Sequence, residues 1–340
     1  MSIKKVAEIA GVSIATVSRY FSKPDLLKND TYENVKRAVN QINYKPNTLA
    51  QNFRRGKSGL IVVVVDNIGN PIYENFTHII THIAQSSGYD VFIKESSSTH
   101  LTIKYYQDML DSKQADGIIL MTDLPHIHQA SRSIIDELPI IFIDSSNSTI
   151  PDTPYSHINL DNYQAAQSAT QHLLTLGHEN ITCVTPEDVN STYIHRVGGY
   201  KAAIESAGLK TQQVLYACQS PSNIEKLVER VLYASPAVTA LFCTDDDIAI
   251  DILPLLKQQG RIVPDDISVI GFNNIRYSAR TSPPLSTVEL PLADIATQAI
   301  QQLCAKIDTS YQSTNDDYSE ISSPLKHQLI LRESTASPSS

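Results

Sequence analysis

Polar side chains follow several short aliphatic runs of this 340-residue chain, where they could bind a small molecule. The loop Asp66–Tyr73 comes directly after the aliphatic run Leu60–Val65, and Asp161-Asn162 and Asn190–Thr192 follow later runs in the same way. Ligands of parallel α/β folds bind in the crevice at the carboxyl ends of the strands. These loops are therefore expected to meet at one ligand-binding cleft.

Motifs for catalysis and metal binding are missing from the sequence. It contains no G-x-S-x-G elbow, no G-x-x-x-x-G-K-[ST] phosphate loop and no G-x-G-x-x-G dinucleotide motif. His78 and His82 are four residues apart on a predicted helix, and His126 and His128 lie in a predicted loop. Neither pair has a nearby third ligand, so both are expected to be solvated surface residues. We predict no enzyme, no metal site and no cofactor.

The charged residues are unevenly distributed along the chain. Residues 1–60 carry 11 basic and 4 acidic side chains, a net charge of +7, whereas residues 61–340 carry 16 basic and 32 acidic side chains, a net charge of −16. A basic N-terminal region on an acidic body indicates that only this region meets a polyanion. No apolar run approaches the roughly 18–20 residues of a membrane span, and the widely spaced cysteines are typical of a reducing compartment, so we predict a cytoplasmic protein without a membrane partner.

Residues 1–46 are predicted to form three short helices. The first two cover Ile3–Ala10 and Ile14–Phe21, and Gly11 supplies the backbone geometry of the tight turn between them. A third helix is expected behind Asp30-x-x-Glu33, which resembles a capping box. Helices this short can bury their narrow apolar stripes only against one another. The pattern therefore predicts a trihelical head that begins with a helix-turn-helix.

The rest of the chain alternates short aliphatic runs with amphipathic stretches. Strands are predicted at Leu60–Val65, Asp90–Lys94, Gly117–Met121, Ile140–Ile143, Ile181–Val184, Val214–Tyr216, Thr239–Phe242 and Ser268–Ile270. Helices are predicted from Ile72 towards Gly88 and at about 102–113, 162–176, 193–207, 222–234 and 246–259. This alternation is typical of parallel sheets covered on both faces. Eight strand-helix units exceed one compact sheet, so two subdomains with a cleft between them are expected.

Two motifs near the N-terminus carry a family resemblance. V-A-x-x-A-G-V-S-x-A-T-V-S-R runs from Val6 to Arg19, and N-Y-x-P-N-x-x-A runs from Asn43 to Ala50. With these motifs the chain resembles the lac-repressor (LacI/GalR) family of bacterial transcription regulators. The resemblance implies a small all-α helix-turn-helix DNA-binding head and an α/β periplasmic-binding-protein-like core of two doubly wound parallel-sheet subdomains. It also implies a homodimer that reads a palindromic operator in double-stranded DNA.

The resemblance implies the following domain boundaries. The DNA-binding head covers residues 1–46, a hinge helix and linker cover 47–59, the effector-binding and dimerisation core covers 60–335, and a disordered tail covers 336–340. The chain is expected to cross between the two subdomains near residues 160, 290 and 322. The N-subdomain then comprises about 60–159 and 291–321, and the C-subdomain about 160–290 and 322–335.

The DNA-contacting residues are carried over from the family position by position. Ile14 and Ala15 occupy the specificity pair of the recognition helix, and Ile14, which lacks hydrogen-bonding groups, is expected to contact thymine methyls. Ser13 and Thr16 are expected to contact phosphate, and Arg19 a guanine or phosphate. The hinge is expected to contact the minor groove through Asn47, Ala50, Gln51, Phe53 and Arg54. Phe53 stands where the family usually has leucine, and its ring can still unstack a base step.

The effector-binding residues come from the same resemblance. Arg196 lies in the family's R-x-x-G-[FY] pattern and is the strongest candidate. Ile72 and Tyr73 occupy two aromatic positions, and Asn273 occupies a position that is usually aspartate. The predicted set is Ile72, Tyr73, Asp161, Asn190, Thr192, Arg196, Asp246 and Asn273. The amide of Asn273 keeps hydrogen-bonding capacity and loses the charge, which is expected to shift ligand preference.

We therefore predict a DNA-binding transcriptional regulator, most simply a repressor, that is nucleoid-associated when bound to its operator. Its operator affinity is controlled by a small molecule in the cleft. Pro186-Glu187-Asp188 and Lys113-Gln114-x-Asp116-Gly117 look most like the cytidine-repressor branch, so the effector is a nucleoside or nucleobase, or alternatively a sugar. The alternative function is a solute-binding protein of the same fold. It is disfavoured because an export signal is missing and because a DNA-reading head precedes the core.

Overall fold

The computed structural model describes most of the chain: residues 2–45, 56–96, 102–122, 137–144, 157–187, 190–210, 213–218, 221–234, 236–309 and 325–339. It divides into two compact units, Met1–Gly59, which contains the head, and Leu60–Ser340, the core. The five predicted hinge contacts, Asn47, Ala50, Gln51, Phe53 and Arg54, lie outside the described residues.

The head contains the three helices that the sequence predicts. They are α1 (Ile3–Ala10), α2 (Ile14–Ser22) and α3 (Asn29–Gln41), with a short 3-10 helix η1 (Pro24–Leu26) before α3. Gly11 ends α1 in the left-handed conformation, with φ 65°. The predicted capping box at Asp30 is wrong, because α3 already begins at Asn29 and Lys28 is its N-cap residue.

The three head helices share one small apolar core. Val6 from α1, Val17 from α2 and Val35 from α3 are each fully buried. They pack with Ala7 and Ala38 in a single cluster. Because each helix contributes only one or two buried side chains, no two of them would form a stable pair alone. The helix-turn-helix is thus held in shape by the third helix.

The core contains two parallel sheets that place the candidate loops. The first has the strand order β2-β1-β3-β4-β5, formed by β1 (Leu60–Val65), β2 (Asp90–Glu95), β3 (Gly117–Met121), β4 (Ile140–Asp144) and β5 (His157–Asn159). The second has the order β7-β6-β8-β9, formed by β6 (Ile181–Pro186), β7 (Gln213–Ala217), β8 (Ala240–Cys243) and β9 (Ser268–Ile270). All eight predicted strands are present. The ninth strand of these two sheets, β5, was not predicted from the sequence and is only three residues long.

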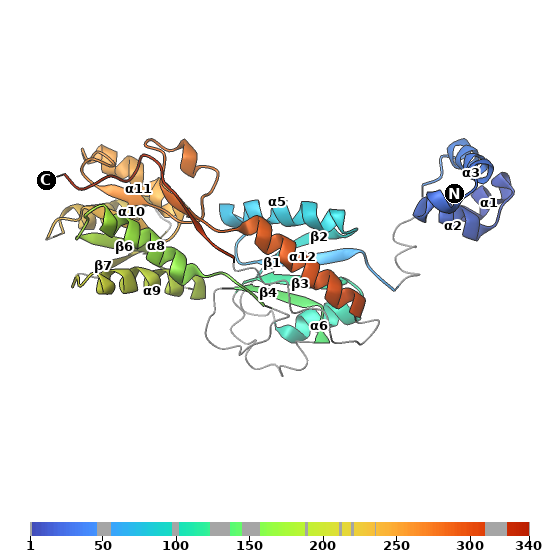
Figure 1. Cartoon of the computed structure of the whole chain (residues 1–340), viewed down its shortest axis with the longest axis horizontal. Coiled ribbons are helices and arrows are strands. Elements are labelled where there is room, and N and C mark those ends of the chain that lie inside the picture. The colour runs from blue at the N-terminus through green and yellow to red at the C-terminus, as the bar shows by residue number, and fades with distance from the viewer. Residues whose placement is uncertain are drawn as a thin grey trace. The chain divides into compact units, whose positions relative to one another are not determined.

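Helices cover both faces of each sheet, as Figure 1 shows for the first sheet, with α5 and α12 on one face and α6 on the other. The covering helices are α5 (Pro71–Ser86), α6 (Ile103–Asp111) and α12 (Leu292–Thr309) in the N-subdomain, and α8 (Asn162–Thr175), α9 (Ser191–Ser206), α10 (Pro221–Leu232) and α11 (Asp246–Gln258) in the C-subdomain. No helix in the described part of the chain is both long and apolar enough to cross a bilayer.

Strand β1 shows why the aliphatic runs identify buried strands. Ile61 and Val63 point into the cluster with α5 and α12, whereas Val62 and Val64 point into the cluster with α6. All four are at most 2% exposed. Because successive side chains of a strand point to opposite faces, a strand covered on both faces has no position left for a polar residue.

The chain passes between the subdomains in the segment after β5 and again in the segment after β10. Strand β5 belongs to the first sheet, and α8, which begins three residues later, packs closely on α9 in the C-subdomain. Strand β10 (Thr287–Glu289) pairs antiparallel with β11 (Gln328–Ile330), and α12 then packs against α5. The expected third crossing, near residue 322, lies outside the described residues.

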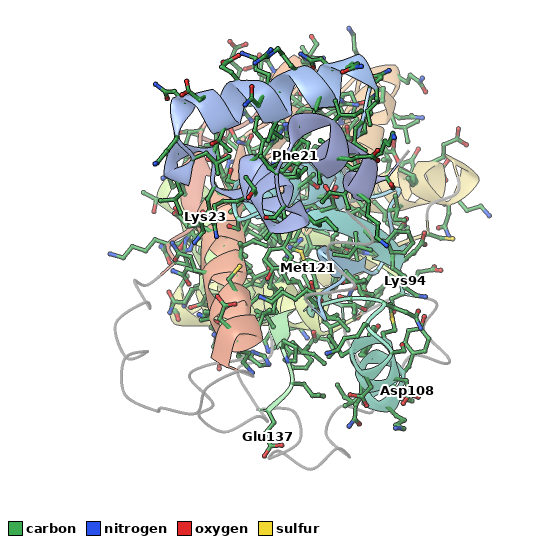
Figure 2. The ribbon with its side chains drawn as sticks, turned by 90° about the vertical axis from the view of Figure 1, so that its right-hand side faces the viewer. Phe21, Lys23, Lys94, Asp108, Met121 and Glu137 are labelled. Carbon is green, nitrogen blue, oxygen red and sulfur yellow. The ribbon has the colours of Figure 1, made fainter. Side chains whose placement is uncertain are left out.

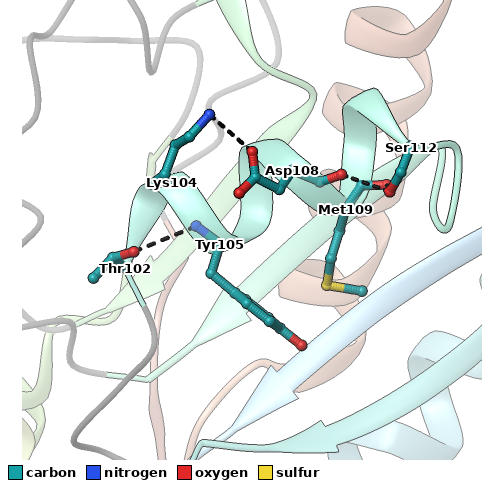
Figure 3. Close-up of polar contacts among 6 residues, drawn as sticks. All are labelled: Thr102, Lys104, Tyr105, Asp108, Met109 and Ser112. Atoms are coloured by element: carbon teal, nitrogen blue, oxygen red, sulfur yellow. Dashed lines mark hydrogen bonds and ion pairs between the residues drawn. The ribbon is translucent and has the colours of Figure 1, made fainter.

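Helix α6 illustrates how local hydrogen bonds set an element's ends (Figure 3). The Tyr105 N–H donates to Thr102 Oγ1 at 3.3 Å at the start of the helix, and Ser112 Oγ donates to the Asp108 carbonyl at 2.6 Å at its end. Lys104 and Asp108 form an exposed ion pair of 2.8 Å between successive turns. Asp108 points away from the sheet (Figure 2). This polar outer side leaves the opposite side of α6 for the apolar cluster.

The C-terminal tail is ordered, so the prediction of a disordered segment over residues 336–340 is wrong as far as the described residues reach, to 339. His178 Nε2 lies 2.8 Å from the Ala336 carbonyl, and the Ala336 N–H donates to Ser268 Oγ at 3.0 Å. Ser339 Oγ donates to the Asp265 carbonyl at 2.5 Å. The tail therefore forms hydrogen bonds with the C-subdomain. The polar composition of the tail does not predict these bonds.

Two buried tyrosines of the core are expected to respond oppositely to removal of their hydroxyl groups. Among the described residues, the Tyr106 hydroxyl is buried without a hydrogen-bond partner, whereas the Tyr200 hydroxyl donates to the Ile181 carbonyl at 2.7 Å. Tyr106→Phe should raise the free energy of unfolding by up to about 1 kcal/mol, and Tyr200→Phe should lower it by about 1 kcal/mol. Thermal unfolding of both variants tests this. A Tyr106→Phe variant as destabilised as Tyr200→Phe would contradict it.

Candidate effector pocket and DNA-binding surface

One cavity of the core is lined by both subdomains. The N-subdomain contributes Asp66, Asn70, Ile72, Tyr73, Met121, Thr122 and Ile143; the C-subdomain and the crossing segments contribute Leu160, Asn162, Asn190, Thr192, Tyr193, Arg196, Asp245, Asn273 and Leu290. Met121, at the end of β3, is labelled in Figure 2. The cavity volume is about 50 Å³, room for only a few water molecules. In this arrangement of the two subdomains the cavity is smaller than a drug-sized ligand.

Arg196 connects three segments at the C-subdomain side of this pocket. Its Nε donates to Asn162 Oδ1 at 2.8 Å, its Nη1 to the Thr244 carbonyl at 2.6 Å and its Nη2 to Asn273 Oδ1 at 3.0 Å. The guanidinium also stacks 3.8 Å from the centre of the Phe272 ring, and the residue is 3% exposed. Burial lowers the pKa of Arg196 from its usual value. Arg196 thus fixes the positions of two pocket amides, Asn162 and Asn273.

Two carboxylates line the pocket, and each accepts hydrogen bonds from a tyrosine. The Tyr73 hydroxyl donates to Asp66 at 3.3 Å, and the Tyr193 hydroxyl donates to Asp245 at 3.0 Å. Asp66 also accepts from the Thr122 hydroxyl. Burial raises the pKa of both tyrosines, and the adjacent carboxylates raise it further. Both phenols therefore stay protonated and serve as hydrogen-bond donors.

Two polar contacts join the subdomains beside the pocket. Asn70 Nδ2 donates to Asp245 Oδ2 at 3.4 Å, and the exposed pair Glu74–Arg276 is 3.1 Å apart. Asn70 also caps α5, because its side-chain oxygen accepts from the Ile72 N–H at 3.0 Å. The first turn of α5 therefore contacts the C-subdomain beside the pocket. Because one of these contacts is long and the other is solvent-exposed, each contributes little to the stability of this arrangement.

The structure places six of the eight predicted effector residues in the pocket wall: Ile72, Tyr73, Asn190, Thr192, Arg196 and Asn273. Asp161 and Asp246 do not line the pocket in this arrangement, and their contact with an effector stays a prediction. Asp161 is the N-cap of α8, and its carboxylate accepts from the Gln164 N–H at 2.9 Å. In both cases the neighbouring residue lies in the wall instead, namely Asn162 and Asp245.

Asp246 is fully buried and has a structural role. Its carboxylate accepts hydrogen bonds from the hydroxyls of Ser278 and Thr287, both at 2.7 Å, and from the Ile275 N–H at 3.0 Å. Burial raises the pKa of Asp246 to about 7, and the three hydrogen bonds oppose that rise. These contacts tie the start of α11 to Ile275 and Ser278 and to Thr287, the first residue of β10.

The predicted set of effector residues did not include Asn70, Asn162, Tyr193 and Asp245, although Asn70 and Asn162 lie in loops that the sequence places at the cleft. Asn162 and Tyr193 each lie one residue from a predicted site residue. Asn162 directly follows the N-cap residue Asp161 of α8, and Tyr193 lies in the first turn of α9, where its N–H donates to the side chain of the N-cap residue Asn190.

The recognition helix α2 presents the predicted residues to solvent. Ser13, Ile14, Ala15 and Arg19 are exposed, and Ile14 keeps 40% of its surface. Thr16 is half-buried and its hydroxyl lies 2.9 Å from Ser13 Oγ. Val17 is fully buried and anchors the helix. An exposed isoleucine at the start of α2 is not part of the head's core and is available to contact a base.

Two family models match the chain. The model described as "Bacterial regulatory proteins, lacI family" matches residues 2–47, and the model described as "Periplasmic binding protein-like domain" matches residues 170–335. These ranges cover the helix-turn-helix head and the C-terminal half of the core. Their order along the chain is the order that the sequence motifs predict.

Curated relatives and solved structures agree with both models. The chain is 32% identical over 313 residues to the transcriptional repressor PurR of Aliivibrio salmonicida, covering 90% of this chain and 92% of the relative. It is 29% identical over 339 residues to the transcriptional repressor CytR of Escherichia coli K12, covering 98% and 96%. The lac repressor dimer bound to operator and the anti-inducer ONPF has the same fold, with a TM-score of 0.80, 22% identity and 99% of each chain covered. The chain belongs to the lacI family of bacterial regulatory proteins.

Proposed function

We propose that the protein is a homodimeric transcriptional repressor whose operator affinity is set by a nucleoside or nucleobase bound in the core pocket. The observation that carries the proposal is the fusion of an exposed recognition helix with a closed two-subdomain pocket in one chain. Repression is supported by the names of the relatives, since PurR and CytR are both named repressors. A protein that acts on operator DNA works in the bacterial cytoplasm, associated with the nucleoid.

The charges of the pocket favour an uncharged effector rich in hydrogen-bond donors. Asp66 and Asp245 supply two carboxylates, whereas the one guanidinium of the wall, Arg196, already donates to three protein oxygens. A phosphate would face two like charges in a poorly solvated site. The hydroxyl and N–H groups of a nucleoside can donate to the same carboxylates. The resemblance to the cytidine-repressor branch favours a nucleoside over a sugar.

A ligand screen tests the effector class. Nucleosides, nucleobases, nucleoside 5′-monophosphates and mono- and disaccharides are added to the full chain, and the thermal transition of the core is measured. We expect a nucleoside or nucleobase to raise the transition temperature, because a ligand of the folded state stabilises it by mass action. The matching monophosphate should have a smaller effect. A sugar as the strongest ligand would favour the alternative effector class, and a stronger effect of the monophosphate would contradict the charge argument.

Ligand binding is coupled to DNA binding through the angle between the subdomains. A ligand larger than the 50 Å³ cavity changes how the two subdomains meet. Strand β1 belongs to the N-subdomain sheet and is the first strand after the head in the chain, so a change at the cleft is passed towards the head through β1. A differential affinity of about 1–3 kcal/mol between two core states is enough to switch operator binding.

Deletion of residues 1–58 is the direct test of DNA binding. Operator sequences are selected from random double-stranded DNA with the full chain, and binding is then measured by fluorescence anisotropy for the full and the truncated chain. The full chain should bind with an affinity that falls steeply with salt, because Lys and Arg side chains displace counterions. The truncated chain, which keeps the compact unit Leu60–Ser340, should not bind.

The same experiment separates the competing functions. If both forms bind DNA equally, or neither binds at any salt concentration, the regulator function fails and the solute-binding alternative gains. An enzymatic function is not proposed, because the pocket residues include no nucleophile activated by a base: its polar side chains are carboxylates, amides, phenols, threonines and one arginine.

A further inference from the structure

The solvent side of α5 carries two histidines that neither the pocket nor the head uses. His78 and His82 are both exposed and lie on successive turns of this 16-residue helix. Their ring centres are 4.7 Å apart, and the ring planes are inclined at 88°. The sequence alone predicts only two solvated side chains here, and the structure adds that the two rings already lie side by side.

The separation of the rings fits chelation of one metal ion. Zinc binds imidazole nitrogens at about 2.0–2.1 Å, and a tetrahedral ion holding two imidazoles places their ring centres roughly 5 Å apart. The observed 4.7 Å is close to this value. Both side chains are exposed, so each ring can rotate its nitrogen towards a shared ion without disturbing the core. Two histidines at i and i+4 on one helix face are an arrangement that binds zinc elsewhere.

The neighbouring residues limit the site to two protein ligands. Glu74 lies one turn before His78, but its carboxylate pairs with Arg276 at 3.1 Å. Within the described residues, no group of three or more histidine, cysteine, aspartate or glutamate side chains could hold a metal ion. A site on α5 would therefore complete its coordination with water. Such an open site prefers borderline ions that bind imidazole over Mg²⁺ and Ca²⁺, which require oxygen ligands.

We propose that His78 and His82 form a two-imidazole binding site for a divalent transition ion, Zn²⁺, Ni²⁺ or Cu²⁺, on the outer face of α5. Each histidine contributes one neutral ring nitrogen, and the ion links two successive turns of the helix. By the general order of stability of such complexes, Cu²⁺ binds more tightly than Ni²⁺ or Zn²⁺. The site is separate from the effector pocket, so metal binding does not require the effector.

The test uses the untagged full chain with zinc chloride as the probe. Isothermal titration calorimetry measures zinc binding, and thermal unfolding with and without zinc measures stabilisation, since an ion that binds the folded state raises the transition temperature. We expect both signals in the unchanged chain and their loss in His78→Ala and in His82→Ala. Magnesium chloride should produce neither signal. Because both residues are exposed, the variants should unfold at the temperature of the unchanged chain when zinc is left out.

A matched control is provided by the other histidine pair of the sequence. The double variant His126→Ala/His128→Ala should keep both zinc signals. Zinc binding that persists in His78→Ala and His82→Ala, or that is lost only in the control, overturns the proposal. So does a lack of zinc binding to the unchanged chain. None of these outcomes depends on the operator or the effector, so failure of the metal site is distinguishable from failure of the regulatory function.

Discussion

Replacing Arg196 by alanine is expected to weaken effector binding by about 10- to 100-fold, because hydrogen bonds to charged groups contribute about 1.5–3 kcal/mol. The guanidinium lies in the pocket wall and at the same time holds Asn162 and Asn273, which also line the pocket. The substitution therefore removes one polar group of the wall and releases two others. The effector that gives the largest thermal shift in the ligand screen is titrated by calorimetry to measure the loss.

The same substitution is expected to lower the stability of the core. Arg196→Ala leaves the oxygens of Asn162, Thr244 and Asn273 without their donor in a buried position. An unsatisfied buried acceptor costs about 1–3 kcal/mol. Thermal unfolding should therefore begin at a lower temperature. Since the head is a separate compact unit, operator affinity should persist at temperatures where the core is still folded, and only its response to effector should be lost.

Arg261→Ala is the matched control for Arg196→Ala. Arg261 follows α11 and is exposed, so its loss should change neither effector affinity nor stability by a measurable amount. An Arg196→Ala variant that keeps full effector response in a DNA-binding titration would show that the guanidinium has no part in the site. Equal losses in both variants would point instead to the net charge of the core.

The longer strands of the core were predictable because a strand buried on both faces requires a continuous run of apolar residues. The run Ile61–Val65 contains no polar residue, and all five side chains are buried. A strand with one face in water would instead alternate apolar and polar residues. The three-residue strands β5, β10 and β11 carry no such signal: His157 and Asn159 flank the single buried Ile158 of β5. These strands form because other strands hydrogen-bond to their backbones. The pairing strands lie elsewhere in the chain, so the local sequence does not predict them.

The site was predictable by loop but not always by residue. Asp245 and Asp246 are adjacent aspartates after β8, and the sequence assigns the second of them to the effector. The helix decides otherwise, because Asp245 caps α11 with an extended backbone and faces the pocket, while Asp246 is the first helical residue and turns into the C-subdomain. The direction of a side chain changes within one residue at a helix start. Composition and spacing do not determine it.

Helices α8 and α9 of the C-subdomain can pack closely because α9 has a glycine, Gly199, at their contact. Helices α8 and α9 pack along each other, and a Cβ atom added at Gly199 would lie 2.1 Å from the Tyr163 carbonyl oxygen and 2.9 Å from the Gln167 nitrogen. Both atoms belong to the backbone of α8, so no side chain can move aside to make room. The same approach brings Arg196, on α9, to Asn162, on α8. Gly199 therefore sets the helix spacing that the pocket requires.

Gly199→Ala is consequently expected to destabilise the core by about 3 kcal/mol, the upper end of the usual cost of overpacking. For a unit of this size, the transition temperature should fall by roughly 2–4 °C per kcal/mol. Gly198→Ala is the control, because its Cβ would meet only the Tyr163 ring, at 3.3 Å, and alanine favours a helix over glycine by about 1 kcal/mol. Gly198→Ala should thus be neutral or slightly stabilising in thermal unfolding. Two variants with equal stability would show that α8 and α9 can separate without cost, and Gly199 would then have no role in placing Arg196.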